Sequence, residues 1–112
     1  MPGQRGGGVH TPIWLPWFVY LGGHSLTLTD ATSVEQPLPA RCTGVEITAE
    51  GGVVYANVNA AASAGSPYFI AENACRPIGP LSNLRSLHLC SDNSGAIAHI
   101  AFYCEHVDLP GA

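Results

Sequence analysis

The segment AIAHIAFYCE, residues 96–105, alternates strictly between two faces. Every second residue from 96 to 104 is apolar (Ala96, Ala98, Ile100, Phe102 and Cys104), and the residues between them are mixed. A period of two is that of a β-strand, whose successive side chains point to opposite sides. The same alternation recurs in HSLTLTD and in TGVEITAEGG. No stretch repeats apolar residues at helical spacing over three turns without Gly or Pro, so the pattern predicts an all-β protein.

Glycine and proline divide the chain into short pieces. There are 13 glycines and 9 prolines among 112 residues, a length that fits one domain. The pieces between them predict about seven or eight short strands, arranged as an antiparallel β-sandwich or jelly roll. The expected organisation is a Gly/Pro-rich, flexible and extended N-terminal arm (residues 1–17), a β-sandwich domain (residues 18–107) and a short tail (residues 108–112).

Three local signals predict how strands end and pair. WFVYL is expected to be a strand that stops at Gly22 and Gly23. The turn Glu50-Gly51-Gly52 is expected to join its two flanking strands in a hairpin, and DNSG (residues 92–95) is expected to form a second hairpin. In that second hairpin His88 falls opposite Ala98, one step from His99, so the two imidazoles are expected on opposite faces.

Charged residues make up only 11% of the chain, against about 25% in an average soluble protein. The four basic residues are all arginines, namely Arg5, Arg41, Arg76 and Arg85. A surface with so few charges indicates a subunit whose faces are covered by other subunits; the alternative is a monomer with a neutral surface.

Nucleic acid and membrane are not expected as partners. The net charge of −4 and the scattered arginines leave no clustered basic patch for a phosphate backbone. The apolar stretch PIWLPWFVYLGG is too short to span a bilayer and is broken by Pro16. It also lacks the cleavage site of a signal peptide, so synthesis and folding in the cytosol are expected.

The four cysteines, Cys42, Cys75, Cys90 and Cys104, form no CxxC or other close pair. Buried free thiols are the favoured interpretation, because cysteine behaves as a small hydrophobic residue. A disulfide framework is the main alternative and metal ligation the third.

The histidines do not predict a metal or catalytic site. His88 and His99 have no HxH or HxxxH pattern and no carboxylate beside them in the sequence. A GxSxG motif is absent, and in GHS (residues 23–25) adjacency does not orient His24 onto Ser25. We therefore expect no enzyme, no catalytic residue, no cofactor and no metal.

The block GVEITAEGGVVYANVNAAASAGSPYFIAENACRPIGPLSNLRSLHLCSDNSGAIAHIAFY, residues 44–103, covers more than half of the chain. It resembles small β-sandwich structural proteins from the morphogenesis clusters of tailed bacteriophages, of the capsid decoration (cement) type or neck and tail components. The resemblance implies a virion protein, assembled in the host cytoplasm, that forms homo-oligomers, with a homotrimer favoured. It also implies the major capsid protein as a partner and stabilisation of the shell by bridging capsid proteins.

Aromatic residues near the arm and near the Ala/Ser/Gly-rich loop are the predicted contacts. They are Trp14, Trp17, Phe18, Tyr20, Tyr68 and Phe69. Aromatic side chains are enriched at protein interfaces. The alternative function is a carbohydrate- or receptor-binding β-sandwich of a phage tail or neck, in which tryptophans and tyrosines form a stacking platform for sugars.

Overall fold

The computed structural model describes residues 18–29 and 31–105, which form eight strands and contain no helix. The predicted arm (1–17) and tail (108–112) lie outside the described residues. The strands are β1 (Phe18–Thr27), β2 (Val34–Gln36), β3 (Gly44–Glu50), β4 (Val54–Val58), β5 (Tyr68–Ile70), β6 (Cys75–Ile78), β7 (Leu87–Cys90) and β8 (Ile97–Glu105).

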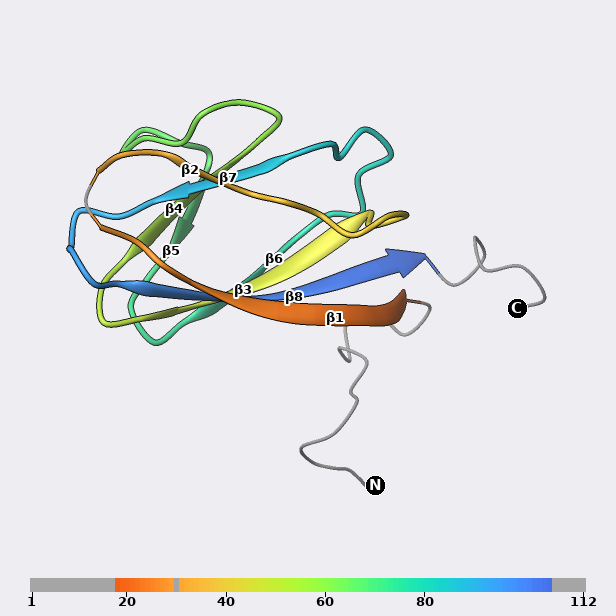
Figure 1. Cartoon of the computed structure of the whole chain (residues 1–112), viewed down its shortest axis with the longest axis horizontal. Helices are drawn as coiled ribbons and strands as arrows, with labels where there is room; N and C mark the ends of the chain where they lie inside the picture. Colours follow the sequence, from red (N-terminus) through yellow and green to blue (C-terminus); the bar gives the residue numbers. More distant parts are fainter. Residues whose placement is uncertain (1–17, 30, 106–112) are drawn as a thin grey trace, which may run out of the picture.

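The strands form two four-stranded sheets, with the orders β1-β8-β3-β6 and β2-β7-β4-β5. All neighbouring strands in these sheets are antiparallel. Figure 1 shows the sheets as two layers, with β1, β3 and β8 in one layer and β2 and β7 in the other. This strand order is that of a jelly roll, so the predicted all-β sandwich is confirmed.

The core lies between the two sheets and follows the alternation in the sequence. Val45 and Ile47 of β3 are at most 1% exposed, and Leu87 and Leu89 of β7 are fully buried from the other side. The apolar face predicted for residues 96–104 is buried as well. Each fully buried aliphatic side chain contributes about 1.5–3 kcal/mol, so this shared core holds the layers together.

Both predicted hairpins are wrong. β3 and β4 belong to different sheets, as do β7 and β8. The connections at Gly51-Gly52 and at residues 91–96 therefore cross from one layer to the other. The reason lies in the packing: β3 pairs with β6 and β8, and β7 pairs with β2 and β4, so the apolar faces of β3 and β4, and those of β7 and β8, meet across the core.

The predicted end of the first strand is also wrong. β1 continues through Gly22 and Gly23 to Thr27, and its register with β8 shifts between Tyr20 and Gly22. Gly22 has φ = +129°, a conformation that is open to glycine and strained for other residues. Glycine here produces a β-bulge inside the strand and does not end it.

Candidate functional site

The outer face of the β1-β8-β3-β6 sheet carries an ordered set of side chains. Strand register places Ser25, His99, Thr48 and Cys75 in one row across all four strands. The next row contains Gly23, Ala101, Glu46 and Pro77. Side chains that are directly opposite on neighbouring strands are close enough to interact, so each row acts as one set of neighbours.

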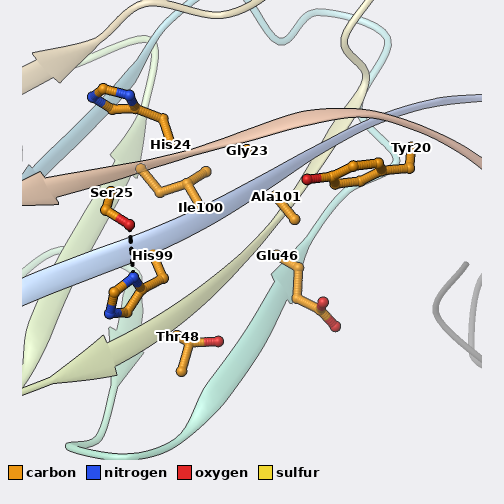
Figure 2. Close-up of a pocket in the computed structure, with 9 residues that line it drawn as sticks. All are labelled: Tyr20, Gly23, His24, Ser25, Glu46, Thr48, His99, Ile100 and Ala101. Atoms are coloured by element: carbon orange, nitrogen blue, oxygen red, sulfur yellow. Dashed lines mark hydrogen bonds between the residues drawn. The ribbon is translucent and has the colours of Figure 1, made fainter. Parts of the chain in front are cut away.

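The small residues of the second row leave a depression in this face, which we call the hollow. Gly23 and Ala101 lie opposite each other in its floor. The hollow has a volume of about 360 Å³ and is open to solvent, and its other lining residues are Tyr20, His24, Ser25, Glu46, Thr48, His99 and Ile100. Figure 2 shows Tyr20 and Glu46 at one end, His99 with Ser25 and Thr48 at the other, and His24 on the far side of β1.

His99 is held by two hydrogen bonds from different strands. Its Nδ1 lies 2.7 Å from Ser25 Oγ, and its Nε2 lies 2.6 Å from Glu50 Oε1. In the tautomer with the proton on Nε2, Ser25 donates to Nδ1 and Nε2 donates to the Glu50 carboxylate. These two contacts fix the plane of the imidazole at the rim of the hollow.

A serine, a histidine and an acid in contact resemble the connectivity of a catalytic triad. The environment differs from that of a triad, because the side chains of His99 and Glu50 are 43% and 60% exposed. Electrostatic stabilisation of a transition state needs a water-excluded site with donors aimed at the developing charge. The Ser25–His99–Glu50 arrangement therefore orients an imidazole, and its geometry gives no support for nucleophilic attack by Ser25.

The opposite end of the hollow is formed by the phenol of Tyr20, which packs on Tyr103, and by the carboxylate of Glu46. The ring centroids of Tyr20 and Tyr103 are 5.7 Å apart, with the planes tilted by 58°. Tyr103 is fully buried, and its hydroxyl has no hydrogen-bond partner among the described residues. Burial, together with the negative charge of Glu46, raises the pKa of Tyr103 to about 12.

Replacing Tyr103 by phenylalanine is expected to raise the free energy of unfolding by about 1 kcal/mol at pH 7, because it removes a buried hydroxyl that has no partner in residues 18–29 and 31–105. The difference in the free energy of unfolding between the Tyr103→Phe protein and the native chain should grow as the pH rises. A phenol titrates near pH 10 when unfolded and near pH 12 here, so the native chain loses stability between these values. Urea unfolding at pH 7 and pH 11 measures both effects. A Tyr103→Phe protein that is less stable at pH 7 would show that the hydroxyl has a partner.

All four cysteines are free thiols, and three of them, Cys42, Cys90 and Cys104, are buried. Cys75 departs from the expected burial, because it lies exposed on the edge strand β6. Burial is the main cause that raises the pKa of Cys42, and desolvation likewise raises that of Cys75. A raised thiol pKa leaves less reactive thiolate at neutral pH.

The predicted contact residues do not form one surface. Trp14 and Trp17 lie outside the described residues. Phe18 is 4% exposed and packs within the domain, while Tyr20 lines the hollow. Tyr68 and Phe69 belong to β5 in the other sheet, where Tyr68 packs against the core and Phe69 is 47% exposed.

The histidines are farther apart than the expected hairpin would place them. His88 lies on β7 and its Nε2 is 2.9 Å from Ser86 Oγ, whereas His99 lies on the other sheet. The sequence showed no carboxylate beside His99, but Glu50 contacts it from 49 residues away. Sequence analysis missed the hollow, because only the β1–β8 and β3–β8 pairings bring its residues together.

Among residues 18–29 and 31–105, no three histidine, cysteine or acidic side chains are grouped closely enough to hold a metal ion. The same residues include no helix that is long and apolar enough to cross a membrane. Comparison of the chain with protein-family models, with curated proteins and with solved structures gave no match.

Proposed function

We propose that the protein is a structural subunit of a virion, of the capsid decoration type, which associates with copies of itself and bridges capsid proteins. The observation that carries this proposal is the strand order β1-β8-β3-β6 and β2-β7-β4-β5. Double-sheet jelly rolls of this order include viral capsid domains as well as lectins. The resemblance of residues 44–103 to tailed-phage structural proteins favours the first of these two classes.

The composition of the surface supports the same proposal. Only 11% of the residues are charged, and none is a lysine. A small domain that works alone normally has many more charges on its surface. Decoration subunits bind only the assembled shell, so by mass action they shift the equilibrium towards assembly. In this proposal the protein has no catalytic role.

An aromatic pair on the outer face of the second sheet is the contact surface that we propose. Tyr55 and Phe69 are cross-strand partners on β4 and β5, with ring centroids 5.7 Å apart. Tyr55 donates a hydrogen bond of 2.8 Å to Asp92, which fixes its ring. Phe69, at 47%, is the most exposed large apolar residue among the described residues, and aromatic residues of this kind anchor interfaces.

Replacing Phe69 by glutamate in the full chain is expected to weaken binding to viral heads at least tenfold, because it puts a charge in a desolvated contact. The fold should be unaffected, since the side chain is exposed. The measurement is co-sedimentation with heads purified from the virus that encodes the chain. Thr27→Glu, an equal charge on the outer face of the other sheet, is the matched control. Unchanged occupancy for Phe69→Glu would exclude this patch, and absence of binding by the native chain would exclude the function.

A further inference from the structure

The hollow has the size and shape of a site for one small ligand. Its volume of about 360 Å³ is near the lower end of the range for ligand pockets, roughly 300–1,000 Å³. Gly23 is required for its form, because a methyl group there would lie 3.0 Å from the Tyr20 hydroxyl and 3.1 Å from the Ile100 carbonyl oxygen. Gly23 thus leaves its part of the floor without a side chain, and the Tyr20 hydroxyl lies close to it.

The two end walls of the hollow are held in place before any ligand arrives. The ring of Tyr20 packs on the buried ring of Tyr103. The imidazole of His99 is fixed by its contacts with Ser25 and Glu50. Side chains that are already ordered lose little entropy on binding, and this saving favours affinity even in a shallow site.

The side wall of the hollow, formed by β3, supplies oxygen atoms that accept hydrogen bonds. Glu46 is half-buried and forms no salt bridge with any described residue, while Thr48 lies beside it on β3. The carboxylates of Glu46 and Glu50 lie at this face and repel anions, and no arginine of residues 18–29 and 31–105 lines the hollow. A ligand here must be uncharged or cationic, and it must donate hydrogen bonds to a carboxylate.

We propose that the hollow binds one neutral pyranose unit of a glycan. The apolar face of a sugar ring packs against an aromatic ring such as Tyr20, and its hydroxyl groups suit the carboxylate of Glu46 and the hydroxyl of Thr48. Both ring nitrogens of His99 are engaged by Ser25 and Glu50, so its imidazole bounds the site without binding a hydroxyl group. A neutral hexose is accepted, whereas a uronic or sialic acid is repelled by Glu46. We expect a dissociation constant of about 1 mM, because a single sugar in an open site makes only a small contact. This site is on the opposite sheet from the Tyr55–Phe69 pair, and it stands whether or not the protein belongs to a virion.

The test is an NMR titration of the intact ¹⁵N-labelled chain with methyl glycosides of glucose, galactose, mannose and N-acetylglucosamine, each to about 50 mM. We expect at least one of them to shift the amide signals of residues 23, 46, 99 and 101. Glucuronic acid should leave these signals in place. Glu46→Gln should weaken the binding roughly tenfold by removing a charge-assisted hydrogen bond. Tyr20→Ala should abolish it.

Glu35→Gln is the matched control, because Glu35 is an exposed carboxylate on β2 of the other sheet. It should bind the glycosides as the native chain does. No shift with any glycoside, or shifts confined to other parts of the chain, would overturn the proposal. The proposal would also be overturned if n-butylammonium bound in the hollow and none of the glycosides did, because the hollow would then be a cation site. If Glu46→Gln and Glu35→Gln weakened glycoside binding equally, the effect would come from the net charge of the protein. That result would also contradict the proposed site.

Discussion

Truncation of Ile47 to alanine is expected to lower the free energy of unfolding by about 3–4 kcal/mol. Ile47 is fully buried on β3, an interior strand that pairs with both β6 and β8. Its side chain belongs to the cluster that joins the two layers, together with Leu87 and Leu89 from the facing sheet. Removing three carbon atoms there loses their burial and leaves a cavity that the paired strands cannot close.

Ile97→Ala is the matched control for this prediction, because it removes the same atoms from the outer face of the same sheet. Ile97 is only half-buried on β8, opposite Glu50 of β3. Its truncation should cost about 1 kcal/mol, in proportion to the smaller buried area. Urea unfolding followed by circular dichroism compares the two variants. Equal losses would mean that β3 does not turn Ile47 towards a second sheet, which would contradict the sandwich.

Replacement of Gly79 by alanine is expected to destabilise the fold by about 3 kcal/mol. Gly79 has φ = +115°, outside the conformations that alanine adopts without strain. A methyl group there would lie 2.7 Å from the Thr43 carbonyl oxygen and 2.9 Å from Gly44 Cα. Both contacts are with backbone atoms, so no rotation of a side chain relieves them, and the start of β3 must move.

Gly65→Ala is the control for Gly79→Ala. No atom lies within 4 Å of the position that its methyl group would take, and its φ is not positive. The free energy of unfolding of Gly65→Ala should stay within about 0.5 kcal/mol of the native value or rise slightly, because alanine lowers the conformational entropy of the unfolded chain. Thermal unfolding of both proteins measures the difference. A native melting temperature for Gly79→Ala would show that the backbone at this connection differs from the one described.

The sequence predicted which faces are buried, and the reason is local. In β3 and β8 the inward positions are apolar and the outward ones are mostly polar or small, so a period of two identifies the core side without knowledge of the partners. Tyr103 is an exception on β8. It lies among the outward positions and is nevertheless fully buried, a property that alternation alone does not predict.

The pairing of strands could not be predicted in the same way. Gly51-Gly52 and residues 92–95 have the composition of tight hairpin turns, yet both connect strands of opposite sheets. The residues of a turn determine how the chain reverses. Whether the next strand then joins the same sheet depends on apolar surfaces that are far apart in the sequence.

The candidate site depended on those distant pairings. Ser25 and His99 are 74 residues apart, and no local motif links them. The sequence predicted the end of a strand at Gly22 and Gly23, whereas in the structure Gly23 lies inside β1 and forms part of the floor of the hollow. Its lack of a side chain leaves space for Tyr20 once β1 is paired with β8.

We propose that the charge-poor faces of this domain are covered by further copies of the chain. Size-exclusion chromatography with light scattering on the full chain, over a wide range of concentrations, tests it most directly. We expect a discrete assembly, with a trimer of the 11.7 kDa chain favoured, that persists on dilution to micromolar concentration. A single species with the mass of one chain at every concentration would contradict it.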